Sequence, residues 1–199
     1  METGVKIIEG SCRGCVNCIK SCPTEALRVI DGKVRIISDL CIDCGECLRS
    51  CREKSLALDE DDWDVLKSHG SSILMADTTF CAQFSHYWSP GLVRKALESL
   101  DMKDLFDEAA TAFDLAAFAT ARKIADSARG SLPLISVYCP AVVRLIQVRF
   151  PELLPRLVDV ENPLETGTLL WRRKTGSSEG VTLVTPCSAK IMLVRGPVG

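Results

Sequence analysis

The sequence lacks the marks of several protein classes. No apolar core of about 7 to 15 residues follows Met1 to Lys6, so there is no signal-peptide pattern and we expect a cytoplasmic protein. A long uncharged apolar run, 131–143, contains two prolines and falls short of the roughly 20 residues that a membrane-spanning helix needs. Because this run is too short, we expect no membrane span. Aromatic residues are also scarce, at 6% of the chain.

Charge and motifs exclude further classes. The chain carries 24 basic and 26 acidic side chains, a net charge of −2, whereas a nucleic-acid binder shows a concentrated basic surface. Neither a P-loop nor a G-x-G-x-x-G motif occurs, so nucleotide binding is not indicated. We expect no nucleic-acid partner.

Cysteine is the residue in excess, with 11 in 199 residues. This share lies below the roughly 8–10% of a small disulfide-rich secreted chain. In a reducing cytosol, thiols are kept for metals or catalysis. Eight of them lie between residues 12 and 51, and the others are Cys81, Cys139 and Cys187.

The eight clustered cysteines form two copies of the pattern C-x2-C-x2-C-x3-C, offset by 29 residues (12 to 41). Three cysteines at these intervals can bind one [4Fe-4S] cluster, and the fourth ligates the other cluster, as in bacterial two-cluster ferredoxins. Structural zinc is the main alternative, but a zinc site usually combines two C-x2-4-C pairs into four ligands, whereas this sequence has two runs of four cysteines. We therefore predict two [4Fe-4S] clusters: cluster I on Cys12, Cys15, Cys18 and Cys51, and cluster II on Cys41, Cys44, Cys47 and Cys22.

The surrounding residues agree with this interpretation. Gly14 and Gly45 allow backbone amides to approach the cluster sulfurs, because glycine tolerates positive φ. Asp31-Gly32 separates two apolar runs and predicts a hairpin. Residues 1–58 therefore resemble a bacterial two-cluster ferredoxin domain, an α+β fold. Five acids in residues 59–64 predict an acidic linker, 59–70.

From residue 71 onward the pattern predicts strands alternating with helices. Strands are expected at 72–76, 132–137 and 181–185, and helices at 90–100, 108–128 and 140–150. This alternation predicts an α/β fold with a parallel sheet. Cys139 and Cys187 each follow the carboxyl end of a predicted strand, and Cys81 lies slightly beyond another, at the edge where such sheets bind ligands. The alternative is that they are small buried hydrophobic residues.

Three segments, 137–143, 150–154 and 185–190, resemble the first two signature motifs of the [FeFe]-hydrogenase catalytic domain, which a two-cluster ferredoxin domain precedes in that family. The resemblance implies that Cys139 and Cys187 match ligands of the H-cluster cubane and that Lys190 matches a lysine at the binuclear iron site. The family's proton-donating cysteine is Tyr138 here, and its third motif, with two more cubane ligands, falls beyond Gly199. We therefore expect residues 71–199 to form a truncated, partial hydrogenase-like α/β domain without a complete H-cluster.

Three interpretations of the second domain stay open: no metal, a third iron–sulfur cluster on Cys81, Cys139 and Cys187, or an H-cluster shared with residues outside this chain. The leading functional hypothesis is a non-catalytic electron-transfer subunit, relaying single electrons inside a hydrogenase or electron-bifurcating oxidoreductase complex. The resemblance implies partner subunits of the flavoprotein or NAD(P)H type, hydrogenase subunits and ferredoxin. The alternative is a catalytic or sensory [FeFe]-hydrogenase whose H-cluster is completed by residues outside this chain.

Overall fold

The computed structural model describes residues 3–68, 73–127 and 133–195. The chain divides into two compact units, and each is formed by separate stretches of sequence. The first combines Met1–Glu60, Cys139–Pro155 and Cys187–Gly199, and the second combines Asp61–Tyr138 and Arg156–Pro186. The sequence predicts two continuous domains, whereas two segments of the hydrogenase-like region group with the ferredoxin-like residues.

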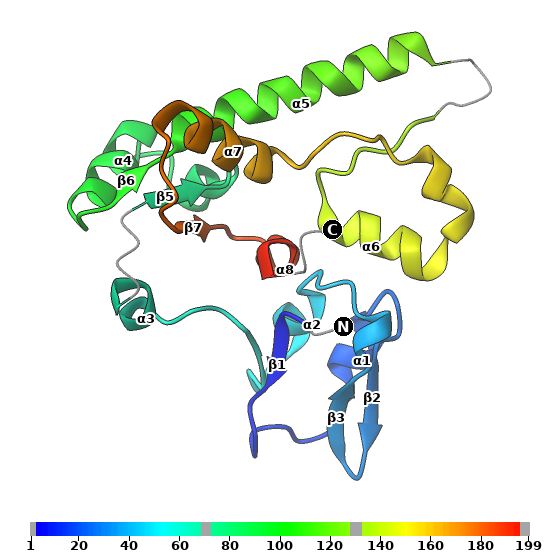
Figure 1. The fold of residues 1–199 in the computed structure, drawn as a ribbon. Coiled ribbons are helices and arrows are strands. Elements are labelled where there is room, and N and C mark those ends of the chain that lie inside the picture. Colours follow the sequence, from blue (N-terminus) through cyan, green and yellow to red (C-terminus); the bar gives the residue numbers. More distant parts are fainter. Residues whose placement is uncertain (1–2, 69–72, 128–132, 196–199) are drawn as a thin grey trace. The chain divides into compact units, whose positions relative to one another are not determined.

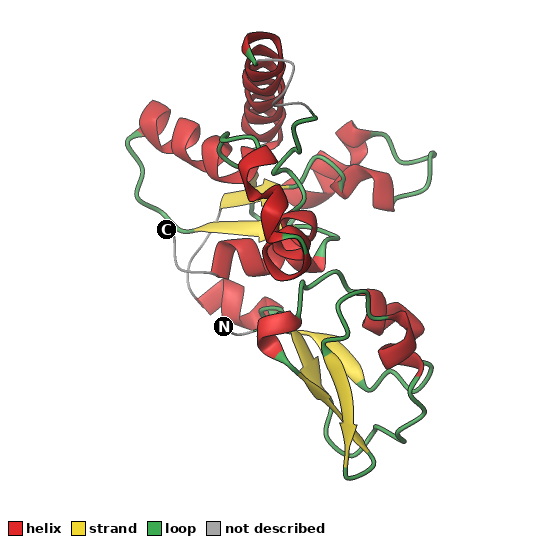
Figure 2. Ribbon diagram, turned by 90° about the vertical axis from the view of Figure 1, so that its right-hand side faces the viewer, coloured by secondary structure: helices red, strands yellow, loops and turns green. Residues whose placement is uncertain are grey.

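The first unit contains two small antiparallel sheets with short helices beside them (Figures 1 and 2). One sheet pairs β1 with β4, and the other pairs β2 with β3. Its core includes Val5, Leu27, Val34 and Leu56, against which several cysteines pack. The elements are β1 Val5–Ile7, α1 Asn17–Ser21, β2 Leu27–Ile30, β3 Lys33–Ile36, η1 Ser38–Leu40, α2 Glu46–Ser50, β4 Leu56–Leu58, α6 Pro140–Arg149, η4 Pro151–Arg156 and α8 Ser188–Arg195.

The predicted hairpin at Asp31-Gly32 is confirmed. Strands β2 and β3 pair with Ile30 opposite Lys33, which leaves a two-residue turn. Asp31 and Gly32 both have positive φ, 51° and 72°, as a type I′ turn requires.

The internal repeat is visible in the backbone. Helices α1 and α2 are related by the 29-residue offset, and each is preceded by a left-handed residue, Val16 or Gly45. The hydroxyls of Ser21 and Ser50, at equivalent positions in the two helices, lie 2.8 Å apart in a mutual hydrogen bond. The two cysteine runs therefore adopt matching local structures.

The second unit contains a three-stranded parallel sheet with the order β6-β5-β7, so the prediction of parallel pairing is confirmed. All four residues of β5 are buried. Ile73 and Met75 pack in one core cluster with Leu105 and Trp171, while Leu74 belongs to another with Met102. Such two-sided burial is typical of parallel strands. The elements are α3 Trp63–Ser68, β5 Ile73–Ala76, η2 Phe80–Gln83, α4 Pro90–Glu98, β6 Lys103–Asp104, α5 Phe106–Asp126, α7 Pro163–Thr175 and β7 Val181–Val184.

One predicted strand is wrong. Within 132–137, of which residue 132 lies outside the described residues, the structure has a single isolated bridge between Ile135 and Leu157. Pro133 lacks an amide hydrogen and Pro140 begins α6, so only a short stretch is available for pairing. Cys139 is consequently the N-cap of α6 rather than a residue at the edge of the sheet.

Three helices beyond residue 58 were not predicted. Helix α3 lies inside the predicted acidic linker, 59–70, α7 contains the basic residues 172–174 in its last turn, and α8 follows Cys187. None of the helices in the described part of the chain combines the length and the apolar character needed to cross a lipid bilayer.

Candidate metal centres

The first cysteine-lined cavity, which we call site I, encloses about 370 Å³, part of it open to solvent. Its lining includes the three closely spaced cysteines of the first run and, from the second run, Cys51. Its walls also include Val29 and Val34 of the hairpin, together with Ser55 and Leu56. The cysteines are Cys12, Cys15, Cys18 and Cys51.

A second cavity of the same size, site II, has the reciprocal composition. Three cysteines of the second run line it together with Cys22 of the first run, and Thr24, Ala26 and Asp43 contribute to its walls. The cysteines are Cys41, Cys44, Cys47 and Cys22. Each cavity thus gathers the four cysteines that the spacing predicts for one cluster.

Left-handed residues shape the loops around the sites. Gly14 has φ of 70°, and a Cβ there would lie 2.6 Å from the carbonyl oxygen of Gly32. The equivalent of Gly14 in the second repeat is Asp43, which also has positive φ, 52°. The loop of site I therefore passes too close to the hairpin turn for any residue with a side chain.

Backbone amides hydrogen-bond to the fourth cysteine of each run. The amide of Ala26 donates to Cys22 Sγ at 3.2 Å, and the amide of Ser55 donates to Cys51 Sγ at 3.2 Å. Such hydrogen bonds orient the sulfur as a metal ligand.

Burial, and after it the nearby thiols, raises the pKa of several cysteines of the two sites. Burial, followed by the nearby Cys51 and Cys12, raises the pKa of Cys18. Burial, followed by Cys41, Cys44 and Cys22, raises the pKa of Cys47 to about 12. Metal cations compensate such repulsion, and their binding releases the protons.

Site II also carries a carboxylate beside a sulfur. Asp43 Oδ1 accepts a hydrogen bond from the amide of Gly4 at 2.8 Å and lies 3.6 Å from Cys41 Sγ. Burial is the largest cause of the raised pKa of Cys41, about 11. The backbone amide of Asp43 lowers this pKa, and the Asp43 carboxylate raises it.

These residues fit [4Fe-4S] clusters. Each cavity offers four sulfur ligands, a hydrogen-bonded ligand sulfur and apolar walls, the features that iron–sulfur sites use. Within the described residues, no three cysteine, histidine or carboxylate side chains lie close enough together for a single metal ion. In a cubane, each thiolate binds a different iron.

Helices α6 and α8 pack against the ferredoxin-like residues within the first unit. Arg149 of α6 donates to the carbonyl oxygen of Thr24 at 2.6 Å. The Ser188 hydroxyl of α8 donates to the carbonyl oxygen of Asp43, and a Cβ on Gly45 would lie 2.9 Å from Ser188 Oγ. Helix α8 therefore lies directly on the loop of site II.

The three remaining cysteines occupy different places. Cys139 caps α6 and Cys187 precedes α8, and both are half-buried in the first unit, where these helices contact each other. Cys81 lies in η2 of the second unit. Lys190, on the first turn of α8, is buried. Metal binding by these cysteines stays a prediction.

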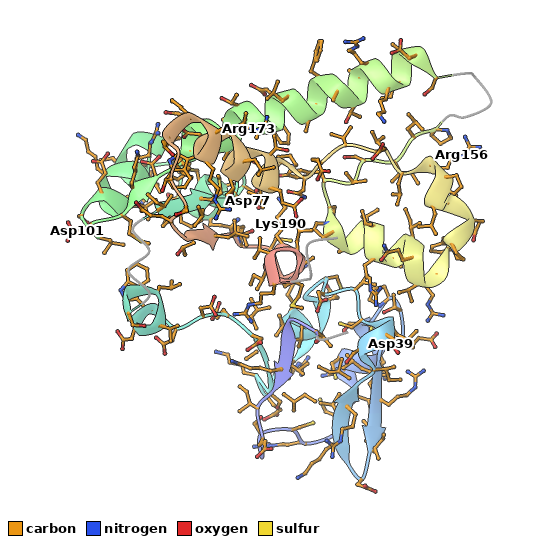
Figure 3. All side chains as sticks on the ribbon, in the orientation of Figure 1. Asp39, Asp77, Asp101, Arg156, Arg173 and Lys190 are labelled. Carbon is orange, nitrogen blue, oxygen red and sulfur yellow. The ribbon has the colours of Figure 1, made fainter. Side chains whose placement is uncertain are left out.

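Sequence reasoning missed a buried carboxylate at the carboxyl end of β5. Asp77 is 1% exposed, and Figure 3 labels it. Its carboxylate accepts hydrogen bonds from the hydroxyls of Tyr138 at 3.1 Å, Thr79 at 3.0 Å and Thr185 at 3.0 Å. Tyr138, at the position where the resemblance places a proton-donating cysteine, is thus a partner of this carboxylate. The sequence signal for Asp77 was its position directly after the predicted strand 72–76, at the edge where parallel sheets bind ligands.

The fold of the first unit and its two cysteine-lined cavities define an iron–sulfur protein of the two-cluster ferredoxin type. Residues 4–52 match the family described as 4Fe-4S dicluster domain. Residues 73–192 match the family described as iron only hydrogenase large subunit, C-terminal domain. This match covers more than half of the chain, which therefore belongs to the iron-only hydrogenase large subunit family and joins an iron–sulfur domain to a hydrogenase-like domain. Among curated proteins, no significant match is found.

Proposed function

We propose that this protein is an electron-transfer subunit that relays single electrons through two [4Fe-4S] clusters within a multi-subunit oxidoreductase complex. When bound, each cluster can accept and release one electron. The observation that carries the proposal is the reciprocal lining of the two cavities, with three cysteines from one run and one from the other. Sites that share ligands between repeats are necessarily close neighbours, as single-electron relay requires.

Contacts within the first unit support a route from site II toward the hydrogenase-like segments. The carbonyl group of Asp43 is bonded to the amide nitrogen of Cys44, a site II cysteine, and accepts a hydrogen bond from Ser188. Cys187 directly precedes Ser188. One hydrogen bond therefore connects the peptide of a site II ligand with the residue after Cys187.

Iron analysis and spectroscopy of the full chain test this proposal. After anaerobic loading with iron and sulfide, we expect about eight irons per chain and two one-electron EPR signals on reduction. A Cys22→Ser variant should impair only site II, and Cys51→Ser only site I. Binding of about four irons, or loss of both signals in each variant, would refute the two-site arrangement.

A second candidate is a catalytic [FeFe]-hydrogenase whose H-cluster is completed by residues outside this chain. It is favoured by one observation, the placement of Cys139 and Cys187 at the starts of two helices that contact each other. Infrared bands of iron-bound CO and CN⁻ after maturation would support this candidate, and their absence from a fully loaded complex would exclude it.

The partners that we propose are flavoprotein or NAD(P)H-type subunits, hydrogenase subunits and ferredoxin. The family membership of residues 73–192 supports a place beside hydrogenase chemistry. Affinity purification of the chain from its native cells should recover a flavoprotein subunit. Recovery of a protein kinase or phosphatase instead would favour a sensory role.

A further inference from the structure

We propose that the two cluster sites have unequal reduction potentials and that site I has the higher one, because Ser55, which lines site I, has a buried hydroxyl free to donate a hydrogen bond there, and acidic side chains line site II. This inference rests on the proposed function, since it requires that both sites bind clusters. It adds an order of reduction, in which the first electron taken up by the chain resides at site I.

The buried hydroxyl of Ser55, which has no hydrogen-bond partner among the described residues, indicates that site I holds a ligand. Ser55 is 2% exposed, lines the cavity of site I, and its Oγ has no hydrogen-bond partner among the described residues. A buried hydroxyl without a partner is costly, so such groups are rare in folded proteins. The sulfide of a cluster in the cavity would provide the missing acceptor. A hydrogen bond to sulfur raises the potential, because it stabilises the more negative reduced state.

The internal repeat provides a built-in comparison. The 29-residue offset places Ala26 at the position of Ser55, and the amides of both residues donate to the equivalent sulfurs of Cys22 and Cys51 at 3.2 Å. Ala26 lines site II in the way that Ser55 lines site I. The backbone is therefore matched, and the hydroxyl is the difference between these positions.

Charged side chains favour the same order. Site I is lined by Arg13 and Glu53, which form an ion pair with a 3.3 Å contact and carry no net charge together. Site II is lined by Asp43 and Glu46, which carry two negative charges. Asp43 lies 3.6 Å from Cys41 Sγ. Adding an electron is less favourable beside negative charge, so site II is harder to reduce.

One contact opposes this order. The hydroxyl of Thr24, which is fully buried at site II, lies 3.7 Å from Cys22 Sγ and can donate to it. This contact is long, and Arg49 offsets part of the charge of Glu46 through a 3.5 Å ion pair. Among the described residues, the carboxylate of Asp43 has no such cation beside it; its partners are the amide of Gly4 and the thiol of Cys41. The carboxylate of Asp43 should therefore lower the reduction potential of site II by more than the hydroxyl of Thr24 raises it.

The experiment is a potentiometric titration of the loaded full chain with dithionite, followed by EPR. In the unmodified chain we expect two separate one-electron midpoints. Ser55→Ala should lower the upper midpoint by about 59 mV, which corresponds to a tenfold change in the one-electron equilibrium constant, and leave the lower midpoint in place. The reciprocal Ala26→Ser and the charge variant Asp43→Asn should each raise the lower midpoint.

The proposed order of reduction is tested by which of the two midpoints shifts and in which direction. A Ser55→Ala variant that shifts the lower midpoint, or neither, would overturn the inference, as would coincident midpoints in the unmodified chain. Each of these three results leaves the proposed function intact when about eight irons are bound. Iron content well below eight would instead refute the proposed function. Ser55→Ala removes one atom from a buried position, so it decides the question even where Ala26→Ser binds less iron.

Discussion

The close approach of Gly14 to the hairpin turn gives a quantitative prediction for site I. In a Gly14→Ala variant the new Cβ meets the carbonyl oxygen of Gly32 at 2.6 Å, and this atom belongs to backbone that cannot rotate away. The left-handed conformation of Gly14, with φ of 70°, adds a cost of about 1–2 kcal/mol for any residue other than glycine. Displacing the turn adds about 1–3 kcal/mol. The expected destabilisation is therefore about 2–5 kcal/mol.

Gly10→Ala is the matched control. Gly10 also has a positive φ, 75°, but a Cβ there would meet nothing within 4 Å. It should cost only the conformational part, about 1–2 kcal/mol. Thermal unfolding of the iron-loaded chains, at equal iron content and followed by the visible absorbance of the clusters, measures the difference. Equal melting temperatures for the two variants would refute the close packing of this loop against the turn.

Three further sets of substitutions test other contacts. Asp77→Asn should lower the free energy of unfolding of the second unit by about 2–3 kcal/mol without changing iron content, because it removes a buried charged acceptor of several hydroxyls; equal stability would contradict this. Ser21→Ala and Ser50→Ala should each cost about 1 kcal/mol, and the double variant should cost less than their sum in thermal unfolding; strict additivity would show that the hydroxyl pair is not coupled. Gly167→Ala should cost about 1 kcal/mol in thermal unfolding, since its Cβ would lie 3.1 Å from Met75 Cε, a flexible side-chain end; a cost of several kcal/mol would mean that the methionine cannot move.

The parts of the fold that short sequence patterns determine were predicted well. The Asp31-Gly32 turn was recognisable because few other dipeptides allow positive φ at both positions. The helix from Pro140 was recognisable because proline favours the first turn and a second proline follows at 151. The grouping of the cysteines into two sets follows from the pattern alone, and the cavities show the same sets.

Features that depend on contacts distant in the sequence were not predictable in this way. The apolar stretch at 132–137 has the composition of a strand, but within the described residues it forms only one bridge. The grouping of 139–155 and 187–199 with the ferredoxin-like residues depends on hydrogen bonds such as that between Ser188 and Asp43, 145 positions apart. The role proposed for Ser55 required the cavity, although comparison of the two repeats would have revealed the serine–alanine difference.

The most direct test of the two-site arrangement is the iron content and the EPR spectrum of three iron-loaded proteins: the unmodified chain and its Cys22→Ser and Cys51→Ser variants. We expect about eight irons in the unmodified chain. We expect loss of the site II EPR signal alone in Cys22→Ser and of the site I signal alone in Cys51→Ser, because each fourth cysteine lines the cavity of the opposite repeat. A chain with about four irons, or variants that each lose the signal of their own repeat, would contradict the two-site arrangement.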